Sequence, residues 1–153
     1  MSNAPNPRKE MMVAAIENGT VIDHIPADKI FQVMSLLHLE RIRSAVTIGY
    51  NLESKQMGTK SIIKIADKHF SDEEISQLAV LCRHITLSTI RDYQVVEKRR
   101  VSLPDEITGI VRCPNPKCIT NHEPMRTRFH VIDGTLTCHY CNNSTPLDKV
   151  TII

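Results

Sequence analysis

The chain has 153 residues, of which 41% are hydrophobic and only 4% aromatic, and it has no tryptophan. Its formal net charge of +2 is close to neutral, which argues against a surface for the phosphate backbone of nucleic acids. No apolar run is long enough to cross a membrane. We therefore expect a soluble, cytoplasmic protein of one domain or two small ones that binds neither nucleic acid nor membranes.

The first predicted elements are a strand and a helix. Two apolar segments, 12–16 and 20–25, flank Asn18-Gly19, which is a strong turn signal. After Pro26, apolar residues recur at i, i+3, i+4 and i+7, a spacing typical of a helix with one buried face that ends near Leu39. This stripe consists of Ile30, Val33, Met34 and Leu37.

Two strands with alternating polarity are predicted next. In residues 46–52 the alternation puts four apolar side chains on one face, and in residues 59–66 it puts Ile63 and Ile65 on one face. Lys60 and Lys64 fall on the opposite face of the second strand, so their ammonium groups point the same way. The four apolar residues of the first strand are Val46, Ile48, Tyr50 and Leu52.

A second helix and two further strands complete the first module. Ser71 to Glu74 form a capping box with acidic residues in the first helical turn, where the helix dipole favours them. Strands are predicted over 85–90 and 93–98. The order β-α-β-β-α-β-β indicates an α+β fold, a ferredoxin-like antiparallel sheet with two helices on one face. The stripe of the second helix is Ile75, Leu78, Ala79 and Cys82, and Cys82 is most simply a small core residue.

The last third has shorter elements. Residues 99–106 have no periodicity and contain a proline, as expected of a linker. The segments that follow have few large apolar side chains and cannot easily fold alone, so we predict a small all-β domain that depends on a metal. Its strand-like segments are 107–112, 127–132, 136–138 and 150–153.

Four of the five cysteines form two close pairs in this part, with the spacing C-x4-C-x19-C-x2-C. Two cysteine pairs, each held by a short turn, are typical of a tetrahedral zinc-ribbon site. Four sulfur ligands leave the zinc ion no open coordination position, so we predict one structural zinc ion per chain. Two alternatives stay open: two disulfides in an oxidising compartment, and a redox dithiol at the C-x2-C pair. The predicted ligands are Cys113, Cys118, Cys138 and Cys141.

An ordered set of segments resembles a known family, the regulatory chain of aspartate carbamoyltransferase, over nearly the whole chain. The resemblance rests on Gly19 to Pro26, Thr47 to Leu52, Gly58 to Ile65, Asp92 to Val96, Ser102 to Pro104, and the cysteine quartet that follows Val111.

This resemblance implies a regulatory subunit that is not an enzyme. It implies a nucleotide-binding allosteric domain over 1–103, and a zinc domain over 104–153 that contacts the catalytic chain of aspartate carbamoyltransferase. The effectors would be ATP, CTP or UTP, the pathway pyrimidine biosynthesis, and a second copy of the chain a further partner in a regulatory dimer. The implied nucleotide-site residues are Val13, Ile16, Val21, Asp23, His24, Lys60, Lys64, Ser88, Ile90, Tyr93, Val95 and Lys98.

The chemistry of these residues agrees with the implied site. A triphosphate needs several positive charges, which Lys60, Lys64 and Lys98 can supply from two strands. The base of the nucleotide needs apolar walls, which Ile16, Tyr93 and Val95 can supply. Ser88 departs from the family, which commonly has an asparagine there, and this bears on effector selectivity. On pattern alone, lysines on strands are more often a solvated edge, and the alternative function is a zinc-ribbon nucleic-acid-binding protein.

Overall fold

The structure is a computed structural model that describes residues 15–153, and these residues divide into two compact units, one that ends at Val101 and one that begins at Ser102. We call them the N-terminal and C-terminal units and describe each by itself. Within the described residues, no helix is both long and apolar enough to span a membrane. Val13 and most of the predicted segment 12–16 lie outside the described residues.

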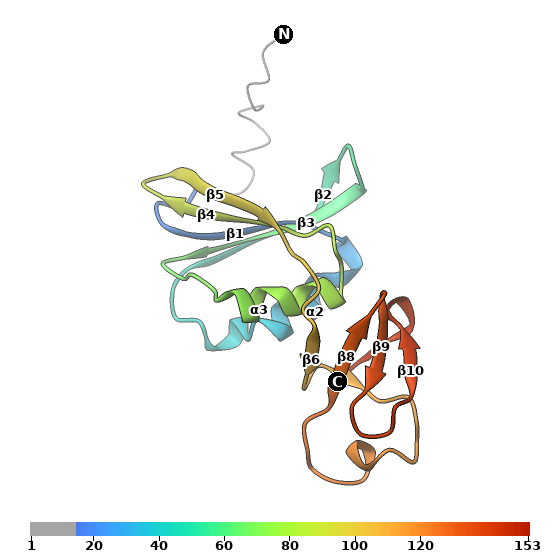
Figure 1. Ribbon diagram of the computed structural model, residues 1–153. Coiled ribbons are helices and arrows are strands. Elements are labelled where there is room, and N and C mark those ends of the chain that lie inside the picture. The colour runs from blue at the N-terminus through green and yellow to red at the C-terminus, as the bar shows by residue number, and fades with distance from the viewer. Residues whose placement is uncertain (1–14) are drawn as a thin grey trace. The chain divides into compact units, whose positions relative to one another are not determined.

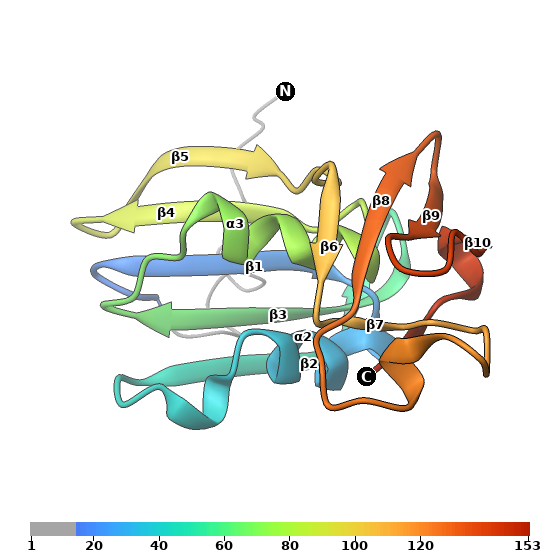
Figure 2. The same cartoon turned by 60° about the horizontal axis from the view of Figure 1, so that its bottom comes forward.

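The N-terminal unit is a five-stranded antiparallel sheet with the strand order β2-β3-β1-β4-β5. Both of its helices, α2 (Ile30–Leu36) and α3 (Asp72–Ser76), cover the same face of the sheet (Figures 1 and 2). This arrangement confirms the predicted ferredoxin-like fold, with β5 added at one edge. The strands are β1 (Gly19–Ile25), β2 (Val46–Ser54), β3 (Gly58–Ala66), β4 (Thr86–Arg91) and β5 (Gln94–Arg100).

The two helices are shorter than their apolar stripes suggested. In α2 the buried residues Ile30 and Val33 face the sheet, and the chain leaves the helix at His38, whose φ of +53° is left-handed. In α3 the Ser71 hydroxyl accepts a hydrogen bond from the Glu74 amide at 3.2 Å, which confirms the predicted cap. Short 3-10 turns extend both helices, and Cys82 is only half-buried beyond the second.

Three bulges interrupt the regular alternation of the sheet. The first lies between Ile22 and Ile25 in β1, the second between Gly49 and Leu52 in β2, and the third in the pairing of β4 with β5 between Thr89 and Ile90. Beyond the second bulge, Leu52 pairs with Lys60, so it lies on the face away from the helices. The prediction that Leu52 shares a face with Val46 and Ile48 was therefore wrong, because the extra residues of a bulge reverse the alternation.

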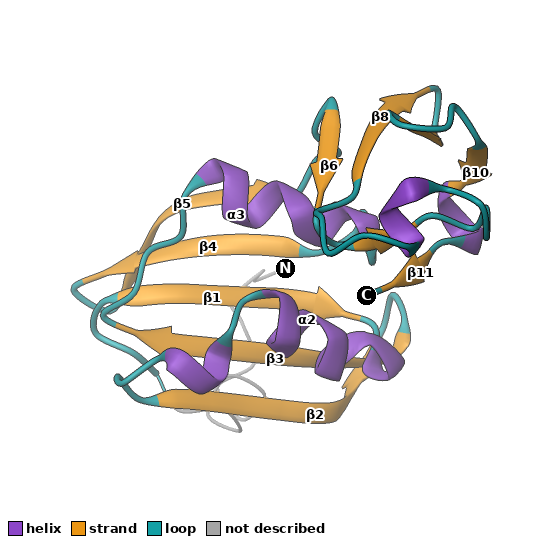
Figure 3. Ribbon diagram, turned by 90° about the horizontal axis from the view of Figure 1, so that it is seen from below, coloured by secondary structure: helices purple, strands orange, loops and turns teal. Residues whose placement is uncertain are grey.

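The C-terminal unit is built from short strands. A four-stranded sheet has the order β10-β9-β8-β6, and β7 (Val111–Arg112) pairs with β11 (Thr151–Ile152). Figure 2 labels β6 to β10, and Figure 3 labels β11. Ile107, Phe129 and Leu136 are completely buried in its core. The other strands are β6 (Glu106–Thr108), β8 (Arg128–Ile132), β9 (Thr135–Cys138) and β10 (Ser144–Pro146).

Two details of this unit differ from the predictions. The predicted strand 107–112 is divided into β6 and β7, because Gly109 adopts a φ of +70° that turns the chain. Strand β10 was not predicted at all. Of its three residues only Thr145 is buried, so it carries no apolar alternation for a sequence pattern to detect.

Candidate functional site

The face of the N-terminal sheet opposite the helices collects the predicted nucleotide-site residues. In an antiparallel sheet, directly paired residues lie on the same face. The register pairs Lys64 with Val21, Val21 with Ser88, and Ser88 with Lys98, so these four residues form one row across four strands. We call this face, which also carries Lys60, the lysine face.

Neighbouring rows extend the lysine face in both directions. On one side, Asp23 pairs with Thr86, and Thr86 pairs with Arg100. On the other side, Gly19, Ile90 and Val95 are linked by the same register. The face therefore has a polar, basic end at Asp23 and Arg100 and a more apolar end at Ile90 and Val95.

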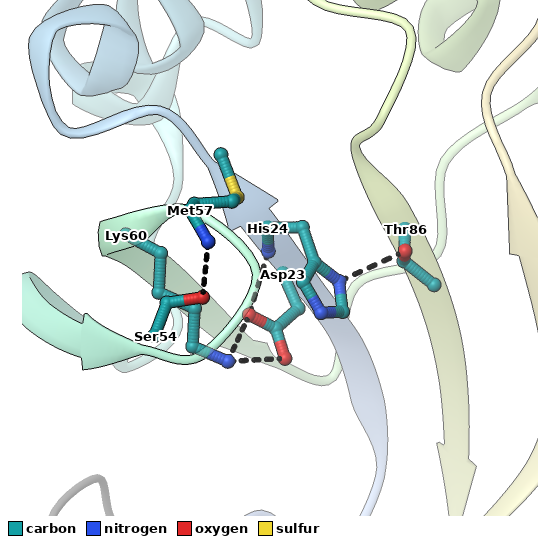
Figure 4. A network of polar contacts seen from close by, with 6 residues as sticks. All are labelled: Asp23, His24, Ser54, Met57, Lys60 and Thr86. Carbon is teal, nitrogen blue, oxygen red and sulfur yellow. Dashed lines mark hydrogen bonds and ion pairs between the residues drawn. The ribbon is translucent and has the colours of Figure 1, made fainter.

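The bulge in β1 contains Asp23 and His24, which lie next to each other at the basic end of the lysine face (Figure 4). His24 has a left-handed φ of +59°, and its amide donates to Asp23 Oδ1 at 2.6 Å. The Lys60 ammonium contacts both carboxylate oxygens of Asp23, at 2.9 and 3.2 Å. His24 Nδ1 lies 3.0 Å from the Thr86 hydroxyl. The Asp23 carboxylate thus contacts two other residues of the predicted site, the Lys60 ammonium and the backbone amide of His24.

The charge around His24 is mostly positive. Burial lowers the pKa of the His24 imidazole, and the cations Lys60, Lys98 and Arg100 lower it further, while Asp23 opposes the shift. The imidazole is therefore neutral at pH 7, surrounded by three positive groups. A bound polyanion would favour its protonation.

A cavity of about 520 Å³ opens beside His24. Lys98 lines it, so the structure brings these two predicted residues to one cavity. Sequence reasoning missed the other lining residues. Arg99 and Arg100 were assigned to the linker because a run of charges has no periodicity, yet β5 extends through Arg100. The further lining residues are Gln56, Met57, His84 and Thr86.

The remaining predicted nucleotide-site residues lie along the sheet or at its end. Ser88 and Ile90 are buried in β4. Tyr93 lies in the turn between β4 and β5, with its side chain exposed and its amide donating to the Glu17 carbonyl at 2.9 Å. Ile16 is half-buried just before β1.

The four predicted metal ligands meet in the C-terminal unit. Their sulfur atoms all lie within 4.8 Å of one another, with Cys113 and Cys141 3.6 Å apart and Cys118 and Cys138 3.7 Å apart. A tetrahedron of four sulfur atoms at 2.3 Å from zinc has edges of about 3.8 Å. The thiol geometry therefore fits a tetrahedral metal ion.

The backbone around the cysteines holds this geometry in place. The Asn121 side-chain amide donates to the carbonyls of Cys113 and Asn115, at 3.0 and 2.8 Å, which closes the first cysteine turn. The Asn142 amide donates to the Cys138 carbonyl at 2.9 Å in the second turn. Burial raises the pKa of the Cys113 and Cys138 thiols, so a cation is needed to hold them as thiolates at neutral pH.

Comparison with known proteins covers both units. The family model described as the aspartate carbamoyltransferase regulatory chain, allosteric domain, matches residues 11–102, and the metal binding domain of the same chain matches residues 105–151. The chain belongs to the aspartate carbamoyltransferase regulatory chain family. It is thus a regulatory, non-enzymatic chain, as predicted, and the match to the metal binding domain includes all four clustered cysteines.

Relatives of the family are similar along almost their full length. The aspartate carbamoyltransferase regulatory chain of Bacteroides fragilis is 55% identical over 149 residues, which is 95% of this chain and 97% of the relative. That of Bacteroides thetaiotaomicron is 53% identical over the same length. The archaeal regulatory chain of Pyrococcus abyssi is 43% identical over 146 residues, or 92% of this chain and 96% of the relative.

Proposed function

We propose that this chain is the allosteric subunit of an aspartate carbamoyltransferase, and that it binds the nucleoside triphosphates ATP, CTP and UTP on the lysine face. The observation that carries the proposal is the meeting of Lys60, Lys98 and Arg100 around His24, beside a cavity, in a chain of this family. Bound nucleotide would change the activity of the catalytic chains in pyrimidine biosynthesis. Family membership favours this function over nucleic-acid binding.

The lysine face can distinguish the two ends of a nucleotide. At the basic end, Lys98 and Arg100 line the cavity and can neutralise a triphosphate, and Asp23 holds the Lys60 ammonium close by. At the other end, apolar residues of the Ile90 and Val95 row can contact a base, together with Val21. His24 lies at the basic end, where it can donate to a phosphate oxygen.

We further propose that the four-cysteine site holds a structural zinc ion. Cys113, Cys118, Cys138 and Cys141 would hold the ion, which supplies a cross-link between the two cysteine turns and takes no part in chemistry. We propose that residues 104–153, ordered in this way, contact the catalytic chain, and that residues 1–103 form the nucleotide domain. Five cysteines that form no disulfide also fit a reducing, cytoplasmic setting.

Pairing with a second copy of the chain is the remaining part of the proposal. Strand β2 lies at an edge of the sheet, and edge strands offer unpaired backbone groups. Next to it, Phe31 of α2 and Tyr50 of β2 contact each other with ring centroids 5.9 Å apart, although both rings are more than half exposed. Ile48 adds a further exposed apolar side chain. These features support self-association along β2.

The nucleotide site is tested by replacing Lys98 with alanine. We expect triphosphate affinity to fall about tenfold to a hundredfold, because a charge-assisted hydrogen bond is worth about 1.5–3 kcal/mol. Isothermal titration of the zinc-loaded chain with ATP, CTP and UTP measures this. Lys149→Ala is the matched control, because Lys149 is exposed in the C-terminal unit. Equal affinity of the Lys98 variant and the wild type for all three nucleotides would contradict the site.

The lowered pKa of His24 predicts a pH dependence of binding. Because its pKa is lowered, the free imidazole is neutral at pH 7, and a triphosphate beside it would raise its pKa, so binding takes up a proton. Affinity should therefore increase as the pH falls from 8 to 6, by about threefold to tenfold more than in a His24→Gln variant. Comparing the two profiles removes the titration of the triphosphate, which is common to both. Parallel profiles would show that His24 does not face the phosphates.

A further inference from the structure

A second group of metal-ligating side chains lies on the outer face of the C-terminal sheet. His130 of β8 pairs with Glu106 of β6, and His139 follows β9 with its amide donating to the Arg128 carbonyl at 2.8 Å. This register places Glu106, Arg128, His130 and His139 on one face, opposite the buried Ile107, Phe129 and Cys138. The four residues, which we call the histidine cluster, are separate from the thiols of the cysteine site.

The two histidines face each other through ring nitrogens. His130 Nε2 lies 3.0 Å from His139 Nδ1, and the ring centroids are 5.2 Å apart. Two imidazole nitrogens that are each about 2.0–2.1 Å from one metal ion lie about 2.9–3.4 Å apart, depending on whether the geometry is octahedral or tetrahedral. The observed separation is within that range. A metal ion could therefore lie between the two nitrogens in place of their hydrogen bond.

The second nitrogen of His130 is already oriented. His130 Nδ1 lies 3.5 Å from Glu106 Oε1, and Arg128 holds that carboxylate with two hydrogen bonds, at 2.7 and 3.2 Å. The hydrogen bond from Arg128 lowers the pKa of Glu106, so the carboxylate is ionised and lies where it can accept a hydrogen bond from Nδ1–H. A carboxylate that accepts from one nitrogen of a histidine leaves the other nitrogen unprotonated, which is the usual outer shell of a histidine metal ligand.

Access and charge also favour a cation at the cluster. The His130 and Glu106 side chains are 38% and 40% exposed, and His139 is exposed. His139 directly follows Cys138, and a zinc ion with four thiolates has a formal charge of −2, which attracts a second cation nearby.

We propose that His130 and His139 form an accessory, solvent-accessible site for a divalent transition metal, with Glu106 as its positioning residue. Imidazole ligands suit zinc, copper and nickel, whereas magnesium and calcium prefer oxygen. Two protein ligands leave coordination positions for water, so the ion exchanges readily. Bound metal would tie β8 to the turn that contains Cys138 and Cys141. The site does not depend on nucleotide binding.

The test is a titration of the full-length, zinc-loaded chain with nickel ions, followed by calorimetry. We expect one nickel ion per chain, with no release of the structural zinc as measured by elemental analysis. His130→Ala and His139→Ala should each weaken nickel binding at least tenfold. Glu106→Gln should weaken it about tenfold to a hundredfold by loss of orientation. His69→Ala, at an exposed histidine of the N-terminal unit, is the control and should bind nickel as the wild type does.

A measurement on the wild-type chain makes the test independent of how the variants fold. Substoichiometric nickel should broaden the ring NMR signals of His130 and His139 before those of the other histidines. Uniform broadening, nickel binding that persists in the double variant, or one zinc ion released for each nickel bound would each overturn the proposal. The last result would place nickel at the cysteines.

Discussion

Replacing Cys113 with serine should release the metal ion and unfold the C-terminal unit, while the sheet of the N-terminal unit persists. Cys113 is buried, and its sulfur lies 3.6 Å from that of Cys141. A structural zinc ion contributes about 10–16 kcal/mol of binding free energy, which the small core around Phe129 cannot replace. If the C-terminal unit docks the catalytic chain, assembly should be lost at the same time.

Cys82→Ser is the matched control for this experiment. Cys82 is the one cysteine outside the cluster, half-buried in the N-terminal unit. Its variant should keep a full equivalent of zinc and should still co-purify with the catalytic chain. Zinc content, limited proteolysis of each unit and co-purification are measured for both variants. A Cys113→Ser chain that lacks zinc but still assembles would show that the metal site is not needed for docking.

Replacing Gly19 with alanine should destabilise the N-terminal unit by about 3–5 kcal/mol, at the upper end of single substitutions. Gly19 has a φ of +141°, and a Cβ atom there would lie 2.1 Å from the Ile65 carbonyl oxygen, so the backbone of β1 or β3 must shift. β1 carries Asp23 and His24, so triphosphate binding should weaken as well. Zinc content should not change, because the cysteines belong to the other unit.

Gly58→Ala separates the steric effect from the backbone effect. Gly58 also has a positive φ, +77°, but a Cβ atom there would meet no heavy atom within 4 Å. Only the left-handed backbone is then strained, which costs about 1–2 kcal/mol. Urea unfolding of both variants, followed by circular dichroism, gives the comparison. An equal loss of stability in the two variants would contradict this prediction. It would mean that β1 and β3 can move apart around a Cβ atom at residue 19 without a further loss of folding free energy.

Most elements of the N-terminal unit could be predicted from sequence because their signals are local. The stripe from Ile30 to Leu37 and the cap at Ser71 depend on residues within one or two turns, and both are present in the structure. The cysteine cluster was predicted for a similar reason, since the spacing within each pair sets a turn that brings two sulfur atoms together. Of the residues that line the cavity at the basic end of the lysine face, only His24 and Lys98 were among those predicted.

Only the tertiary structure determines which residues share one face of a sheet and which of them line the same cavity. The bulge at Asp23 and His24 depends on pairing with β3, and pairing with β5 brings Arg100 opposite Thr86. The contact between His130 and His139 likewise depends on the register of β8 and β9. Local periodicity determined strands, helices and ligand pairs. Register between distant strands determined the sites, because one extra residue in a strand exchanges its two faces.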